Sequence, residues 1–132
     1  MLKELRVSTR SQSQMLDITG QVSEVVAESG IKSGVCYVFV PHTTAGVTIN
    51  ENADPCVVSD ILTETDKIVP WKDGYKHMEG NSAAHIKASL MGFCQTVLVE
   101  CGKLILGTWQ GIYFCEFDGP RNRKVFIKIM EA

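Results

Sequence analysis

The chain has 132 residues, of which 45% are hydrophobic and 21% charged, and its formal net charge is −2. This length suits one folded domain, residues 1–132, and the composition argues against intrinsic disorder, collagen and coiled coils. The charge is too small and of the wrong sign to hold nucleic acid, and no apolar segment is long enough to cross a membrane. Because the charged start MLKELRVSTR is unlike a secretory signal, we expect a cytoplasmic protein with no nucleic-acid or membrane partner.

The first half of the chain contains strand and helix patterns in alternation. Residues 2–19 alternate apolar and polar side chains on both sides of a Ser/Gln-rich turn, which predicts two antiparallel strands, arranged as a hairpin. A helix begins at Asp17 or Thr19, because the apolar residues that follow have helical spacing, and it ends at Gly30. Strands are then expected at 35–40 and 47–50, on either side of the turn-like HTTAG.

The second half begins with a helix, which Asp54 caps and Pro55 opens, ending near Lys67. The segment VPWKDGYKHMEGN, residues 69–81, lacks any period and predicts a long loop, a kind of segment that is often functional. A short helix at 82–90 and at least three strands after it complete the chain. The expected fold is α+β, with an antiparallel or mixed sheet covered by two or three helices.

The five cysteines form no CxxC pair, and most lie in apolar runs. They predict buried, reduced thiols. An alternative, less favoured, is that Cys56 acts as a nucleophile, since it lies near the first histidine in the sequence.

All three histidines, His42, His77 and His85, occur at element ends or in loops, in the strings PHTTAG, YKHMEGN and SAAH. Three imidazoles and one open position would satisfy a catalytic zinc site, so we expect the three to meet around a divalent metal, with zinc favoured and manganese, nickel and iron left open. The alternative is that each histidine hydrogen-bonds its own loop. Neither HExxH nor a zinc-finger spacing is present.

Two other segments offer polar groups to a ligand. In TINENADP, Asn50 is a candidate ligand-binding residue, and Glu51 and Asp54 are candidate catalytic carboxylates, although Asp54 also suits a helix cap. In LGTWQGIYFCEFDGPRNR, Thr108 and Gln110 can hydrogen-bond a ligand, and Arg121 can bind a phosphate or carboxylate. Trp109 is expected in the core or in a subunit interface.

Three blocks together, PHTTAGVTINENADP, HMEGNSAAHIKASLMG and LGTWQGIYFCEFDGPRNR, resemble the YjbQ family over nearly the whole chain. The resemblance implies an α+β homotrimer in which the positions of His42, His77 and His85 supply metal ligands or the floor of a pocket near the subunit boundary. Some members of the family are named secondary thiamine-phosphate synthase enzymes. The resemblance therefore also implies an activity that joins a pyrimidine pyrophosphate to a thiazole phosphate.

The first hypothesis is a metal-dependent enzyme that acts on a phosphorylated or otherwise anionic small molecule. The second is a non-catalytic trimer that binds a small ligand or a metal with the same histidines. A third is a structural trimer in which the histidines are incidental. The first requires a tuned carboxylate, whereas the second does not.

Overall fold

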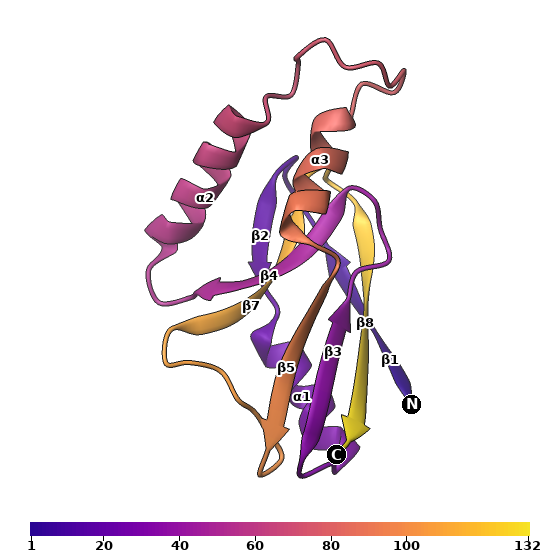
Figure 1. Ribbon diagram of the computed structural model, residues 1–132, viewed down its shortest axis with the longest axis vertical. Helices are drawn as coiled ribbons and strands as arrows, with labels where there is room; N and C mark the ends of the chain where they lie inside the picture. The colour runs from indigo at the N-terminus through magenta and orange to yellow at the C-terminus, as the bar shows by residue number, and fades with distance from the viewer.

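The computed structural model describes residues 1–132 as eight strands and three helices (Figure 1). The elements are, in chain order, β1 (Leu2–Ser8), β2 (Gln14–Asp17), α1 (Thr19–Ser29), β3 (Gly34–Phe39), β4 (Ala45–Glu51), α2 (Pro55–Ile68), α3 (Ser82–Met91), β5 (Cys94–Glu100), β6 (Lys103–Leu104), β7 (Gln110–Glu116) and β8 (Asn122–Glu131).

The strands form two antiparallel sheets rather than one. The larger sheet has the order β1-β8-β3-β5-β6, and the smaller has the order β2-β7-β4. The α+β prediction is confirmed, but the predicted hairpin at 2–19 is wrong, because β1 pairs with β8 and β2 pairs with β7. The alternating pattern identifies a strand and its buried face, whereas it carries no information about a partner that lies far away in the sequence.

The main core lies between the two sheets and α1. Val22 and Val26 of α1 are buried against inward-facing side chains of both sheets, including Val38 of β3 and Phe114 of β7. The helix ends at Gly30, whose φ of 71° is the left-handed conformation that glycine adopts without strain. The predicted helix and its end are thus confirmed.

A second, smaller core covers the other face of the three-stranded sheet. Ala84 and Ala88 of α3 are fully buried there beside Cys115 and Phe117, and apolar side chains of α2 pack at its edge. The Asp54 carboxylate caps α2 by accepting a hydrogen bond from the Cys56 N–H at 2.9 Å, as its sequence position predicts. No residue of α2 is fully buried, so this helix is the least tightly packed of the three.

The outer face of the larger sheet is free of helices. Figure 1 shows α1 on one side of β3, β5 and β8, and no helix on the opposite side. Three rows of paired residues cross this outer face: Leu98–Val35–Met130, Thr96–Tyr37–Lys128 and Cys94–Phe39–Phe126. Leu98, Met130 and Phe39 are exposed there. We call these nine residues the outer sheet face.

None of the three helices has the length and hydropathy that a membrane-spanning helix needs.

The cysteines only partly match the prediction of buried thiols. All five are free, but only Cys36 and Cys115 are buried, and Cys56, Cys94 and Cys101 are exposed. Burial raises the pKa of Cys36 to about 11 and that of Cys115 to about 12, so both keep their protons. Cys94 lies in an apolar run, but its strand position turns it to the outer sheet face.

Candidate functional site

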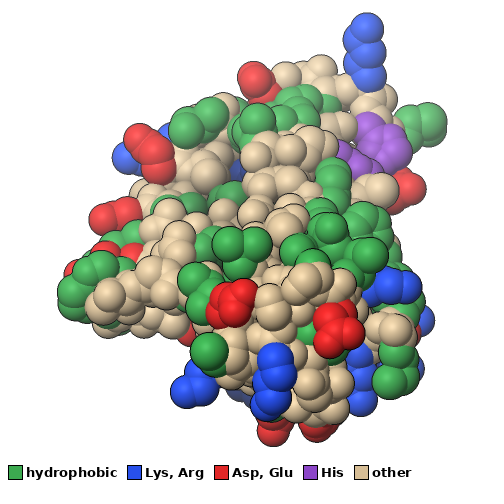
Figure 2. Space-filling view, turned by 60° about the horizontal axis from the view of Figure 1, so that its bottom comes forward, with side chains coloured by type: hydrophobic (Ala, Val, Ile, Leu, Met, Phe, Trp, Pro, Cys, Tyr) green, Lys and Arg blue, Asp and Glu red, His purple; other side chains and the backbone are tan.

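A polar pocket of about 510 Å³ lies at one end of the two sheets. Three segments form it: the loop after β3, the segment leading into α3, and the turn between β7 and β8. Its lining is Pro41, His42, Thr43, Thr44, His77, Glu79, Asn81, His85, Asp118, Arg121 and Arg123. Figure 2 shows histidine side chains, in purple, at the edge of the molecule.

The floor of this pocket is a buried ion pair between Arg123 and Glu116. Arg123 Nε donates to Glu116 Oε1 at 2.8 Å, and a terminal nitrogen of the same guanidinium donates to Glu116 Oε2. That nitrogen also donates to the Thr44 hydroxyl at 2.8 Å. Thr9 and the Asp118 N–H donate to the two carboxylate oxygens. Arg123 is therefore held in one position, because the groups that accept its hydrogen bonds are themselves buried or fixed by further hydrogen bonds.

The carboxylate of this pair stays ionised despite its burial. Burial alone would raise the pKa of Glu116, but hydrogen bonds from Arg123, the Asp118 N–H and Thr9 outweigh it and lower the pKa below its usual value. Both side chains of the pair are therefore charged, and the two charges nearly cancel.

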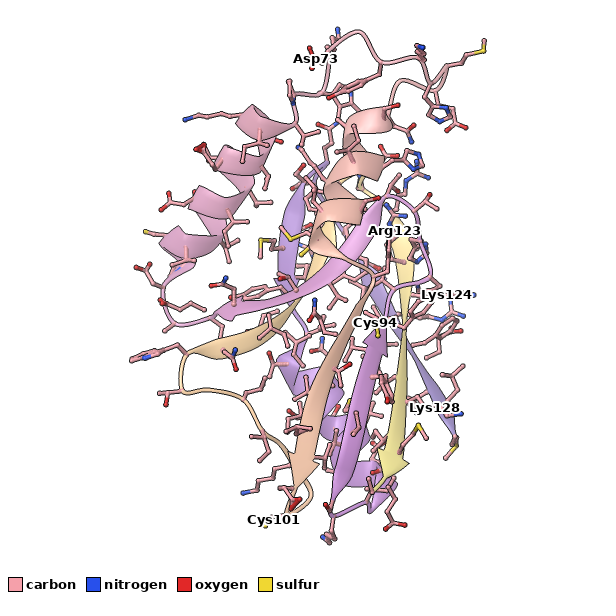
Figure 3. All side chains as sticks on the ribbon, viewed as in Figure 1. Asp73, Cys94, Cys101, Arg123, Lys124 and Lys128 are labelled. Atoms are coloured by element: carbon pink, nitrogen blue, oxygen red, sulfur yellow. The ribbon has the colours of Figure 1, made fainter.

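His42 stands beside this pair, where the chain leaves β3. Its Nε2 accepts a hydrogen bond from the Lys124 backbone N–H at 2.9 Å. Figure 3 labels Arg123 and Lys124 next to one another near the start of β8, at the pocket end of the strand. Burial lowers the pKa of His42, and the Arg123 guanidinium lowers it further.

His77 and His85 form a pair on the opposite wall. Their rings meet edge to face, with centroids 5.5 Å apart. His77 lies in the loop at 69–81, and His85 lies in the first turn of α3. The structure therefore places all three predicted histidines in the lining of one pocket, with two of them in ring contact.

The third side of the pocket is formed by Asn81, Asp118 and Arg121. Asn81 Nδ2 donates to Asp118 Oδ2 at 2.9 Å, and Arg121 donates to the same oxygen at 3.1 Å. The carbonyl oxygen of the Asn81 side chain is buried and has no hydrogen-bond partner. Asp118 thus connects the start of α3 to the β7–β8 turn that carries Arg121.

The other predicted site residues lie at the far end of β4. Ala45 pairs with Glu116 at the pocket end, whereas Glu51 pairs with Gln110 at the other. Six residues of strand separate the two ends, which corresponds to about 20 Å. Asn50, Asp54 and Thr108 belong to the far end as well. Within one chain, the candidate carboxylates and Arg121 therefore do not share a pocket.

These far-end side chains have local partners. Asn50 Oδ1 accepts from the Glu51 N–H, Asp54 caps α2, and Gln110 Oε1 accepts from the Gly107 N–H. Trp109 is 63% exposed between them, so it does not belong to the core of the chain.

The histidines do not fit a three-imidazole metal site in this arrangement. A neutral imidazole has one lone-pair nitrogen, and that of His42 already accepts the Lys124 N–H. No group of three His, Cys, Asp or Glu side chains in the chain is placed to hold one metal ion together. His77 and His85 could supply two ligands at most, and the predicted zinc site stays a prediction.

Several pocket residues were not among the sequence candidates: Thr44, Glu79, Asn81, Asp118, Arg123 and, beneath the lining, Glu116. Asn81 and Asp118 lie inside GNSAAH and DGPRNR, two strings that stood out for their turns and polar groups. Glu116 was harder to identify, because its position in a strand does not reveal that Arg123 follows on the next strand and faces it.

The chain matches the family model described as UPF0047 protein YjbQ-like over residues 3–132. It is 56% identical to UPF0047 protein YugU of Bacillus subtilis over 131 residues, which cover 98% of this chain and 99% of that protein. A crystal structure of a YjbQ/UPF0047 family protein from Clostridium acetobutylicum has a TM-score of 0.96 and 60% identity, covering 97% of this chain and 99% of that one. A YjbQ-like protein from Sulfolobus solfataricus has the same TM-score at 37% identity, covering 100% and 97%. The chain therefore belongs to the YjbQ (UPF0047) family.

Proposed function

We propose that this protein binds a small molecule bearing a phosphate or carboxylate group in the polar pocket, and that it acts on this molecule there. The observation that carries the proposal is the pocket itself: two arginines and three histidines line one cavity whose other side chains, apart from Pro41, are polar or charged. A guanidinium matches the planar fork of a carboxylate and two oxygens of a phosphate.

The two arginines have different roles in this proposal. Arg123 is held by Glu116 and Thr44, so it presents a guanidinium that needs no reorganisation when an anion arrives. Arg121 is about half exposed and bound to Asp118, and it can turn from that carboxylate toward a ligand. Each guanidinium already has a carboxylate partner, and Glu79 also lines the pocket, so the resting pocket has no net positive charge and selectivity depends on the geometry of the donors.

Calorimetric titration with inorganic phosphate and pyrophosphate tests this proposal. We expect binding to the unaltered chain and roughly tenfold weaker binding to Arg121→Gln, because a hydrogen bond to a charged group is lost. Arg6→Gln is the matched control, since Arg6 is an exposed arginine at the surface of β1. Equal affinity of Arg121→Gln and the unaltered chain would refute the proposed site.

For a catalytic role, the edge-to-face pair of His77 and His85 offers the acid and base. The resemblance to secondary thiamine-phosphate synthase enzymes makes the pyrimidine pyrophosphate and the thiazole phosphate the first substrate pair to assay. In that reaction the thiazole nitrogen attacks the methylene carbon while pyrophosphate leaves, and the arginines would stabilise the charge of the leaving group. Product formation by the unaltered chain, lost in Arg121→Gln and kept in Arg6→Gln, supports an enzyme.

The alternative function is non-catalytic binding in the same pocket. Phosphate binding without turnover of this or any other phosphorylated substrate pair favours it. Glu51→Gln separates the two hypotheses only if Glu51 of one chain serves a pocket formed with another, because the two lie at opposite ends of β4 in one chain.

We also propose a homotrimer, which the family resemblance implies. The outer sheet face supports it, since exposed Leu98, Phe39 and Met130 lie on an antiparallel surface that no helix of the chain covers. Light scattering after size exclusion is the measurement. Leu98→Lys should reduce the mass from a trimer to a monomer, whereas Ile68→Lys, at an exposed position outside that face, should not.

A further inference from the structure

The position of His42 follows from the way β3 ends. Phe39 is the last residue of β3 and pairs with Phe126. Pro41 has no N–H and cannot continue the ladder. Two residues before Phe126 on β8, Lys124 therefore has no partner on β3, and the His42 imidazole takes that place, with Nε2 2.9 Å from the Lys124 nitrogen.

This hydrogen bond determines which ring nitrogen carries the proton. An N–H donor requires a lone pair on its acceptor, so Nε2 is unprotonated. A neutral imidazole then has its hydrogen on Nδ1. No group within the chain engages Nδ1, and His42 is part of the pocket lining. His42 can therefore donate a hydrogen bond from Nδ1 to a group in the pocket. Its only lone pair, on Nε2, already accepts the Lys124 N–H.

We infer that His42 serves this pocket as a neutral hydrogen-bond donor, through Nδ1–H, to an oxygen of the bound anion, and that it is not a metal ligand. The donor role rests on the proposed function, whereas the tautomer and the absence of metal ligation do not. Since Arg123 stands beside it, the two would contact the same anionic group, one as a charged fork and the other as a single neutral donor.

The electrostatic surroundings agree with a neutral ring. Burial and the Arg123 guanidinium both lower the pKa of His42, and the Lys124 ammonium acts in the same sense, while Glu116 opposes them. The net direction is downward, which favours the neutral ring. A neutral donor can hydrogen-bond an oxyanion without changing the charge balance of the pocket.

Nitrogen-15 NMR of the labelled full-length protein at neutral pH tests the tautomer without any ligand. We expect the His42 ring to show a protonated Nδ1 and an unprotonated Nε2. Titration with zinc should shift ring nitrogens of His77 or His85, or none, and should leave those of His42 unchanged. A proton on Nε2, or a zinc-dependent shift of either His42 nitrogen, would overturn the inference, whether or not phosphate binds.

Two substitutions test the donor role, each keeping one half of the imidazole. In His42→Asn the amide nitrogen stands near the position of Nδ1, and in His42→Gln the amide oxygen can reach that of Nε2. We expect phosphate affinity to fall roughly tenfold in His42→Gln, because one hydrogen bond to a charged group is lost, and to change little in His42→Asn. The Lys124 partner is lost only in His42→Asn, so thermal stability should fall more in that variant.

The reverse order of affinities, with His42→Asn the weaker binder, would overturn the donor role. Equal affinities in both variants and the unaltered chain would do so as well. If the unaltered chain binds no phosphate, the proposed function fails, and the NMR measurement alone decides the tautomer and the metal question.

Discussion

Arg123 and Glu116 form a nearly solvent-free ion pair beneath the pocket, with Nε of the arginine 2.8 Å from Oε1 of the glutamate. The two side chains are 6% and 0% exposed. They come from the end of β7 and the start of β8, so the pair also holds the turn that carries Asp118 and Arg121. The scaffold of the pocket and the stability of this end of the fold therefore depend on the same contact.

The first prediction concerns removal of one partner of this pair. Glu116→Ala leaves a buried guanidinium without its counterion, and we expect a loss of about 3–5 kcal/mol in the free energy of unfolding. The control is Glu4→Ala, which breaks surface pairs with Arg6 and Lys124 and should cost less than about 1 kcal/mol. Urea denaturation measures both. Similar costs for the two variants would contradict a structural role of the buried pair.

The second prediction concerns strongly acidic pH. Because the pKa of Glu116 is lower in the folded chain than its ordinary value of 4.5, the unfolded chain takes up this proton first as the pH falls. The stabilisation is complete above that value and is lost progressively below it. Glu116→Gln should therefore show a flatter decline of unfolding free energy below pH 4.5 than the unaltered chain. Parallel curves would argue against ionised Glu116 in the fold.

The third prediction places His42 in a higher pH range. Its pKa in the folded chain is lower than the ordinary 6.5, so the unfolded chain binds a proton that the folded chain excludes. Stability should then be highest above pH 6.5 and should begin to fall as the pH drops below it. Chemical denaturation at a series of pH values should show that His42→Gln removes part of this slope. If that variant has a steeper slope instead, His42 is stabilised as a cation.

The fourth prediction concerns the contact between β4 and α3, the helix that carries His85. A Cβ on Gly46 would lie 2.6 Å from the Gly92 carbonyl oxygen and 3.3 Å from that of Ala88. Gly46→Ala must push the end of α3 outward, and we expect a cost of about 1–3 kcal/mol. Gly20→Ala, in the first turn of α1, has nothing within 4 Å and should be neutral or stabilising by up to about 1 kcal/mol. Thermal unfolding should show a lower Tm for Gly46→Ala and an unchanged or higher Tm for Gly20→Ala.

Local signals in the sequence predicted most elements of this fold. Asp54 and Pro55 identified the start of α2, Gly30 the end of α1, and Pro41 the end of β3, because each acts within a few residues of its own position. The pairing of β1 with β8 could not be predicted in this way, since it depends on which strands bury the same core. The prediction of one hairpin failed for that reason.

The site was predicted to a similar degree. Histidines at element ends suggested a shared cavity, and all three line one pocket. Glu51 was assigned to the same site because it follows His42 closely in the sequence, but an extended strand carries it about 20 Å away. Glu116 and Arg123 were missed as a pair, because they lie seven positions apart in the sequence and only the folded turn brings their side chains together.

The last prediction concerns the contact that joins α2 to α3. Lys87 of α3 is 3% exposed, and its ammonium pairs with Asp66 of α2 and lies 5.9 Å from the centre of the Phe117 ring. Since α2 has no fully buried residue, this contact adds to the packing of its apolar side chains against the second core. Asp66→Asn removes the counterion of a buried cation, and we expect a loss of about 1–3 kcal/mol in unfolding free energy.

Hydrogen exchange followed by mass spectrometry should locate this loss, with faster exchange in α2 and in the loop at 69–81 than in the sheets. Asp60→Asn, at an exposed position of the same helix, is the control and should leave exchange unchanged. In Asp66→Asn/Lys87→Met no buried charge remains at this contact, so stability should return toward that of the unaltered chain. Because this loop carries His77, faster exchange there should accompany weaker phosphate binding; unchanged affinity would mean that the pocket does not depend on how α2 is held.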